Sequence, residues 1–358
     1  MTPGTWTIDD EACCSQHGAR FHEVHAGRPV RWPPPEHVGG PEVDLLALLP
    51  ERIPATGVLD VRGAAVDGST GWISVAGRVL RDHTWYGAAL EVERDRPDAH
   101  VRPVHLPGTT VTLMSDFAEV NYGHLLFDVV PRRSLLAGAA VDLDRVDHVL
   151  CCAPPTRRDY VMQLALPVER IVWAEPGVRY RTERLLAPSF PGVRRALQPW
   201  AAAAVRAWLE VPASGSGRRL YLVREEGRRV VNQDELDPVL DELDFERFEP
   251  VSSGEDQRAA FAAADVVVGV AGSALTSILF CAPGASVVEL LPTDHVYPYH
   301  YTAALAAGLD YRYLVVDSTV RRGSGAVGPS VADVVVDVAA FDRALREVVR
   351  QKGAGPLS

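Results

Sequence analysis

The polar residues that could carry chemistry in the first half of the chain lie together in NYGHLLFDVVPR, residues 121–132. Asn121 is a good helix N-cap, so His124 and Asp128 fall one turn apart on one helix face. A carboxylate beside one ring nitrogen fixes the tautomer of a histidine, and the oriented imidazole can accept a proton from a hydroxyl group. The same spacing also suits a purely structural pair. Arg132 follows a proline that we expect to kink or end the helix, and it either contacts a phosphate or caps the helix end.

In the second half, predicted strand ends carry groups suited to a diphosphate. Ligands of open α/β sheets bind beyond the carboxyl ends of the strands, where helix N-termini face anions. Arg224 and Arg228 follow one such strand and can pair with phosphate oxygens. After the next strand, Gly272 lets the backbone approach a ligand, and the amides of Ser273 and Ala274 lie at the start of a helix. Ser273 could instead be only the N-cap of that helix.

Three further side chains could complete a site in the second half. Glu289 lies in an otherwise apolar strand and either binds ribose hydroxyls or forms a salt bridge with a neighbouring arginine. Tyr297 and His300 belong to an aromatic run that either lines a pocket or forms a packing face. The strand ends together indicate a nucleotide-diphosphate site.

The elements that must position these residues alternate between helix and strand. With 358 residues, two domains of similar size are expected. Short β-like runs with Gly and Asp turns fill 57 to about 115. Strands are then predicted at 147–152, 170–173, 182–187, 219–223, 245–248, 265–269, 286–291 and 311–316, and helices at 121–138, 157–166, 193–209, 233–243, 255–263, 273–281 and 297–307. This alternation predicts an α/β fold with parallel sheets.

The predicted domain division places an irregular lead-in first and a helix last. The expected parts are a lead-in at 1–56, an acceptor-side α/β domain at 57–211, a linker at 212–217, a Rossmann-like nucleotide domain at 218–338, and a C-terminal helix and tail at 339–358. A short helix is expected near 43–49 within the lead-in.

Composition and charge exclude several classes of function. The net charge of −11 argues against nucleic acid as the main partner. The five cysteines lack zinc-type spacing, and no His or acidic cluster suggests a dedicated metal site. No apolar run reaches the roughly 18 residues of a membrane span, and no signal-peptide layout is present, so we expect a cytoplasmic protein. No strand leads into GxGxxG, which argues against a dehydrogenase.

Two segments together resemble glycosyltransferase family 61, which contains plant xylan arabinosyl- and xylosyltransferases and animal O-linked N-acetylglucosaminyltransferases. The resemblance runs from about Leu113 to Val316 and rests on 121–132, 218–236 and 265–290. It implies an inverting, metal-independent enzyme of GT-B architecture, with two Rossmann-like domains facing across a cleft. The expected partners are a UDP-sugar donor and a small-molecule or saccharide acceptor, with no cofactor.

The resemblance also implies roles for single residues. His124 and Asp128 match the helix pair of the family, and either could be the base. Arg224 matches its strand-end arginine, Gly272 and Thr276 its glycine-rich turn and helix, and Glu289 its acidic strand residue.

The chain departs from the family pattern at one point. Where the family usually reads His-Gly-Ala-Gly-Leu-Thr-Asn, this chain has AGSALTS from Ala271 to Ser277. Arg224, Arg228 or His300 would then have to stabilise the leaving diphosphate. The alternatives are a nucleotide-sugar-binding protein that has lost catalysis, and a different nucleotide-dependent group transferase on the same fold.

Overall fold

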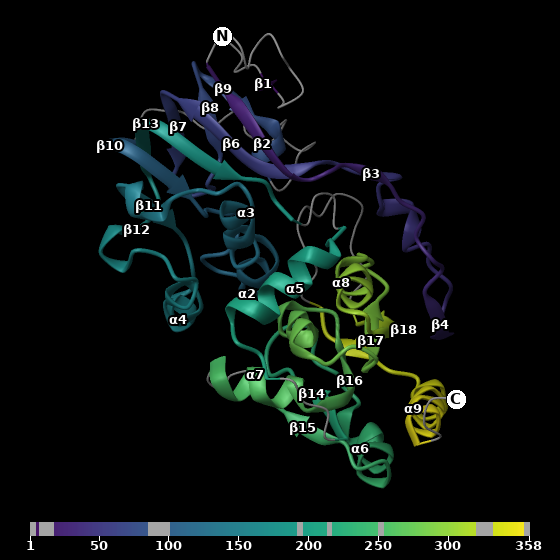
Figure 1. Cartoon of the computed structure of the whole chain (residues 1–358). Helices are drawn as coiled ribbons and strands as arrows, with labels where there is room; N and C mark the ends of the chain where they lie inside the picture. Colours follow the sequence, from purple (N-terminus) through teal and green to yellow (C-terminus); the bar gives the residue numbers. More distant parts are fainter. Residues whose placement is uncertain are drawn as a thin grey trace. The chain divides into compact units, whose positions relative to one another are not determined.

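The computed structural model describes residues 5–6, 18–84, 101–191, 196–212, 217–249, 254–319 and 332–353. The chain forms two compact units (Figure 1): residues 1–30 with 50–196, and residues 31–49 with 197–358. The predicted linker at 212–217 lies mostly outside the described residues, as do Cys13 and Cys14. The division falls at 196/197 instead, because helix α5 (Pro199–Trp208) packs on α8 (Tyr299–Ala307) of the second unit.

The first unit is built on a mixed sheet with the strand order β1-β9-β8-β7-β13-β10-β11-β12, and β6 lies between β13 and β2. Strands β13, β10, β11 and β12 are parallel, whereas β6 and β7 run antiparallel to β13. The strands are β1 (Thr5–Trp6), β2 (Arg20–His25), β6 (Thr56–Arg62), β7 (Ala64–Asp67), β8 (Ile73–Val75), β9 (Arg78–Leu80), β10 (Arg102–Thr112), β11 (His148–Cys151), β12 (Ile171–Trp173) and β13 (Val178–Pro188). A separate pair joins β3 (Arg28–Pro29) to β5 (Arg52–Ile53).

The antiparallel part of this sheet confirms the short β-like runs predicted after residue 57. Strands joined by tight turns pair antiparallel, while parallel pairs need longer crossovers. The crossovers here contain α2 (Tyr122–His124), α3 (Arg132–Gly138) and α4 (Arg158–Met162). The first unit is therefore only partly Rossmann-like.

The second unit has a sheet in the order β15-β14-β16-β17-β18, parallel throughout these strands. This is the doubly wound 2-1-3-4-5 order. The strand that follows β14 in the sequence lies on one side of it, and all later strands are added on the other side, so the order of the strands reverses between β14 and β16. The strands are β14 (Arg218–Leu222), β15 (Glu246–Phe248), β16 (Ala264–Val270), β17 (Ser286–Pro292), β18 (Asp310–Ser318) and β19 (Val334–Val335). The helices, besides α5 and α8, are α6 (Gln233–Glu242), α7 (Gly254–Ala262) and α9 (Val338–Gly353).

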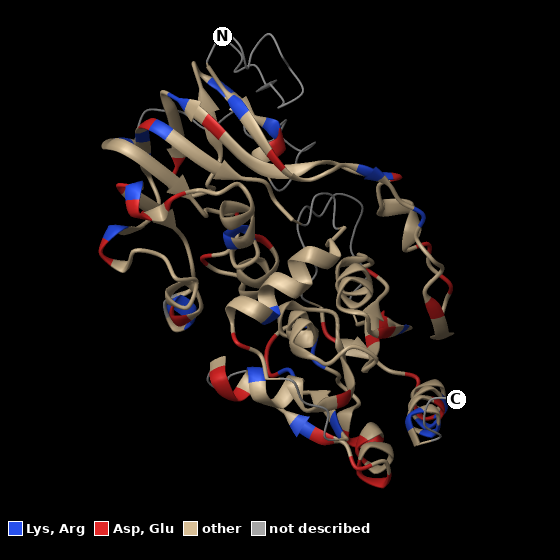
Figure 2. Cartoon of the chain, in the orientation of Figure 1, with Lys and Arg blue, Asp and Glu red and all other residues tan. Residues whose placement is uncertain are grey.

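The core of the second unit lies between its sheet and two of its helices. Alternate valines of two strands share a core with Leu236 and Leu240 of α6 and Phe341 of α9; these valines are Val266, Val268 and Val270 of β16 and Val288 of β17. The outer side of α9 carries charges of both signs (Figure 2). Residues Ser273–Phe280, predicted as an α-helix, form a tighter 3₁₀ helix. The described part of the chain contains no helix long and apolar enough to span a bilayer.

Residues 18–56, the larger described part of the lead-in, contain strands, which corrects the prediction of an irregular segment there. Strand β2 pairs with β6 at the first sheet, and β4 (Glu36–Gly39) pairs parallel with β18 at the second. The expected helix near 43–49 is a single 3₁₀ turn, Leu46–Leu48. Exposed strand edges present unpaired backbone groups, and segments without periodicity of their own can pair with them.

Candidate active site

The helical segment after Asn121 is interrupted where Pro131 occurs. Asn121 caps α2 as predicted, and its side chain accepts a hydrogen bond from the Gly123 amide at 2.8 Å. Residues Leu125–Val129 then widen into a π-helical turn before α3 begins at Arg132. A proline ring clashes with the carbonyl four residues earlier, and π turns relieve such a clash. Such turns occur often at functional sites.

His124 and Asp128 form the predicted contact within this segment. His124 Nδ1 lies 2.7 Å from Asp128 Oδ2. The Asp128 side chain is fully buried, whereas 17% of the His124 side chain is exposed. The Ser115 hydroxyl also donates to Asp128 Oδ2 at 3.4 Å. Only the histidine can therefore reach a ligand, and the carboxylate can only orient it.

Arg132 does not line a pocket, which corrects its sequence-based assignment. Its guanidinium is 1% exposed and donates to the carbonyl oxygens of Thr112, Met114 and Pro188 at 2.6 to 3.3 Å. It also stacks over the Phe190 ring at 4.6 Å. Arg132 thus ties the carboxyl ends of β10 and β13 together.

Burial lowers the pKa of Arg132 to about 10, and the nearby Asp128 charge opposes this lowering. The arginine therefore stays charged at neutral pH. Its interaction with the Asp128 carboxylate stabilises both charges. Asp128 therefore interacts with two side chains, His124 through a short contact and Arg132 through its charge.

Replacing Arg132 with methionine is expected to lower the free energy of unfolding by about 3–5 kcal/mol, because it leaves buried carbonyls unbonded and a buried carboxylate uncompensated. Urea unfolding followed by circular dichroism measures this loss. Arg145→Met is the matched control, since the Arg145 side chain is 87% exposed beside Asp142, and a change within about 0.5 kcal/mol is expected there. Equal losses in the two variants would contradict a structural role for Arg132.

In the second unit, Arg224 lies against Gly272 at the carboxyl ends of β14 and β16. A Cβ atom added to Gly272 would lie 2.2 Å from Arg224 Nη1 and 3.4 Å from Arg228 Nη2. Arg224 Nε also donates to the Gly227 carbonyl at 2.8 Å. The predicted strand ends are therefore adjacent, at the point where doubly wound sheets bind ligands. We call Arg224, Arg228 and Gly272 the arginine seat.

Arg228 is held in an unusual conformation with unpaired donors. Its φ is 56°, a left-handed value that costs a non-glycine residue about 1–2 kcal/mol. Its buried Nε and Nη1 have no hydrogen-bond partner among the described residues. Burial and repulsion from Arg224 lower the pKa of Arg228 to about 10, while Asp294 and Glu289 oppose the lowering. Unpaired buried donors and backbone strain are typical of a site that awaits a ligand.

A pocket of about 380 Å³ adjoins the seat, and Arg224 lines it. Its other walls combine aliphatic side chains with polar ones, namely Tyr221, Leu222, Val223, Arg229, Val230, Val231, Gln233 and Val270. Sequence patterns gave no signal for this pocket because it depends on how the loop after β14 folds back.

Glu289 is buried and does not reach a surface where ribose could bind, which corrects that prediction. Its Oε1 lies 2.7 Å from His300 Nδ1, and its Oε2 accepts from the Tyr311 hydroxyl at 2.5 Å. The direct partners of the Glu289 carboxylate are thus a histidine and a tyrosine. The sequence predicts either ribose hydroxyls or an arginine. Burial and the Glu289 charge raise the pKa of Tyr311 well above its usual value. The sequence does not indicate that Tyr311 contacts Glu289, because the two residues become neighbours only when β18 pairs with β17 in the folded sheet.

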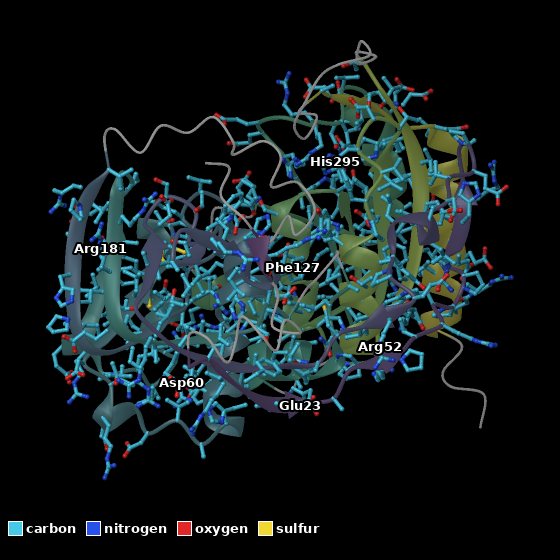
Figure 3. All side chains as sticks on the ribbon, turned by 90° about the horizontal axis from the view of Figure 1, so that it is seen from above. Glu23, Arg52, Asp60, Phe127, Arg181 and His295 are labelled. Atoms are coloured by element: carbon cyan, nitrogen blue, oxygen red, sulfur yellow. The ribbon has the colours of Figure 1, made fainter. Side chains whose placement is uncertain are left out.

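The remaining predicted residues have mixed environments. Ser273 is not the N-cap, because Gly272 occupies that position without a side-chain cap. Ser273 and Ala274 are partly exposed, while Thr276 is buried at 1% exposure and so lies away from the surface. Tyr297 packs its ring against His295, labelled in Figure 3, at 4.8 Å.

The described cysteines are buried and do not take part in the candidate site. Cys151, Cys152 and Cys281 are free and buried, and burial raises their pKa values, to about 12 for Cys152 and Cys281. Within the described ranges, no group of three or more His, Cys, Asp or Glu side chains is arranged to hold a metal ion.

Comparison with protein families matches residues 122–288 to the family described as Glycosyltransferase 61. These residues form a glycosyltransferase 61 domain. The matched segment contains the His124–Asp128 pair and the arginine seat, and it ends one residue before Glu289. No curated protein matches the chain. The protein is therefore a glycosyltransferase, an enzyme that moves a sugar from an activated donor to an acceptor.

Proposed function

We propose that this glycosyltransferase 61 protein moves a sugar from a nucleoside diphosphate donor, a UDP-sugar, to a hydroxyl acceptor with inversion and without a metal ion. The observation that carries the donor class is the arginine seat. Two guanidinium groups converge on Gly272, and buried Nε and Nη1 donors of Arg228 are unpaired among the described residues. A diphosphate supplies the negative charge and the acceptor oxygens that these donors need.

In this proposal His124 is the base and Asp128 the orienting carboxylate. Nδ1 of His124 faces Asp128, so proton acceptance falls to Nε2. The acceptor oxygen attacks the anomeric carbon as its proton passes to His124, and the bond from that carbon to the diphosphate oxygen breaks. The electron pair leaves on the diphosphate, where Arg224 and Arg228 stabilise the added charge. The GT-B arrangement of the two units is part of the same proposal.

The alanine at 271 favours one competing function, a protein that binds a nucleotide sugar without turning it over. Ala271 is 2% exposed and supplies no donor from its side chain. The two arginines already place two positive charges beside Gly272, so we favour the active enzyme. The competing function predicts nucleotide binding with no product.

Product detection tests the proposed function directly. The purified chain is incubated with UDP-sugars and a panel of hydroxyl acceptors in EDTA, and products are identified by mass spectrometry. NMR of the anomeric proton then gives the stereochemistry. The expected product has the inverted anomeric configuration. A retained configuration, or turnover that requires an added divalent metal, would contradict the mechanism.

Gly272→Ala probes the seat without removing a charge. The new Cβ would overlap Arg224 Nη1, and because this is the end of a flexible side chain, the arginine moves while the fold stays. Loss of one charge-assisted contact, about 1.5–3 kcal/mol, should weaken UDP binding about 10- to 100-fold. Calorimetry measures the affinity, and thermal unfolding checks that stability is unchanged. Unaltered affinity would place the diphosphate elsewhere.

A further inference from the structure

A carboxylate with an unpaired oxygen lies at the sheet edge that carries the arginine seat. Asp294 follows β17, and the next residue, His295, is labelled in Figure 3. Because β14, β16 and β17 are parallel, their carboxyl ends share one edge, where Arg228 also lies. The Oδ2 atom of Asp294 is buried and has no hydrogen-bond partner among the described residues. A buried acceptor of this kind costs free energy until another group donates to it.

The other oxygen of this carboxylate is fixed by the end of β18. The Ser318 hydroxyl donates to Asp294 Oδ1. The Ser318 amide donates to Thr293 Oγ1 at 3.3 Å, and the Thr293 amide donates to the Val316 carbonyl at 3.0 Å. These bonds tie the loop after β17 to β18. The carboxylate is therefore oriented within the protein, with Oδ1 already bonded and Oδ2 left for another group.

Asp294 and Arg228 influence each other through their charges but do not pair. The Asp294 charge is the largest of the effects that oppose the lowering of the Arg228 pKa. Nevertheless, Asp294 Oδ2 and the Nε and Nη1 atoms of Arg228 all lack hydrogen-bond partners among the described residues, so these atoms do not bond to one another. A ligand that satisfies both groups must accept hydrogen bonds from the arginine and donate one to the carboxylate.

A diphosphate alone does not meet both requirements. Its ionised oxygens accept from Arg228, but they have no hydrogen to donate to Asp294, and the two negative charges repel each other. A hydroxyl group, in contrast, donates readily to a carboxylate. The ligand that satisfies Arg228 and Asp294 together is thus a phosphate joined to a group that carries hydroxyls, which is a glycosyl phosphate.

We propose that Asp294 determines donor specificity by accepting, at Oδ2, a hydrogen bond from a hydroxyl group of the sugar being transferred, while Arg228 binds the phosphate joined to that sugar. This inference rests on the proposed function, because the diphosphate must occupy the arginine seat. On binding, the Arg228 side chain turns toward the phosphate, and Oδ2 becomes open to the sugar. The carboxylate also stabilises the positive charge that develops on the transferred sugar, and not on the ribose, as the bond to the diphosphate breaks.

Calorimetry with UDP-sugars tests this assignment. UDP-glucose, UDP-galactose, UDP-xylose and UDP-N-acetylglucosamine are compared first, and the tightest binder is then compared with its monodeoxy analogues, each of which lacks one hydroxyl of the sugar. In the native chain, one analogue should bind about 10- to 100-fold more weakly than its parent, because it leaves a charged acceptor unsatisfied. Asp294→Asn should reduce this preference about tenfold, since Ser318 holds the amide oxygen and the N–H group then replaces Oδ2.

The matched control is Asp317→Asn, which removes the same charge from an exposed residue near the end of β18. It should leave the preference unchanged, and thermal unfolding checks that each variant is folded. Ser318→Ala is a second test variant, which frees the Asp294 carboxylate but keeps its charge. It should reduce the preference by a smaller factor than Asp294→Asn does.

Several results would overturn the assignment of Asp294. One is a native chain that binds every monodeoxy analogue as tightly as the parent, and another is a preference that persists in Asp294→Asn. A third is an effect of Asp294→Asn on the preference for UDP over dUDP, since the carboxylate would then bind the ribose. If neither UDP nor any UDP-sugar binds the native chain, the proposed function itself fails.

Discussion

Replacing His124 with alanine is expected to lower kcat about 10²- to 10⁴-fold, the contribution of a positioned general base. The histidine is the exposed member of a pair whose carboxylate is fully buried. Donor binding should be unaffected, because the arginine seat lies in the other unit and keeps all its side chains. Initial rates with saturating donor and acceptor measure the loss.

A matched control for this change is His105→Ala, an exposed histidine on β10 of the same sheet. Its activity should equal that of the native enzyme. Asp128→Asn keeps the shape of the pair but changes the hydrogen bond that orients the ring, so an intermediate loss is expected. If His124→Ala retains full turnover, the base is another group.

Arg228→Gln is the second change with a large expected effect. Removing one donor to a developing negative charge costs about 10²- to 10³-fold in kcat. The free energy of unfolding should rise or stay the same. The variant removes the repulsion from Arg224, and it removes a buried guanidinium whose Nε and Nη1 have no partners among the described residues. Activity assays and thermal unfolding on the same preparation give both values.

The control for Arg228→Gln is Arg218→Gln, at the amino end of β14, where the guanidinium pairs with Glu246 while partly exposed. Exposed pairs contribute little, about 0–1 kcal/mol, so neither activity nor stability should change much. A large stability loss in Arg228→Gln, together with normal activity, would show that the arginine is structural.

Local chemistry made much of the site predictable from sequence. Asn121 capped its helix, the i to i+4 spacing brought His124 to Asp128, and the β-branched run at β16 formed a central buried strand. The adjacency of Arg224 and Gly272 follows from strand order, because β14 and β16 are neighbours. These features depend on periodicity and on rules of parallel sheets.

Side-chain direction and edge pairing could not be predicted in the same way. The sequence around Arg132 suits a phosphate contact as well as burial, and only the approach of β10 and β13 decides between them. Glu289 lies in the expected strand, but its partners come from α8 and β18. Strand β4 forms because β18 leaves an edge to pair with. All three outcomes depend on tertiary contacts between segments far apart in sequence.

Calorimetric titration of the whole chain with UDP in EDTA shows whether the second unit binds a nucleoside diphosphate on Arg224 and Arg228. We expect saturable binding at one site that is lost in the double variant Arg224→Gln, Arg228→Gln and kept in His124→Ala. Binding that persists undiminished in the double variant, or selective binding of NAD in place of UDP, would contradict it.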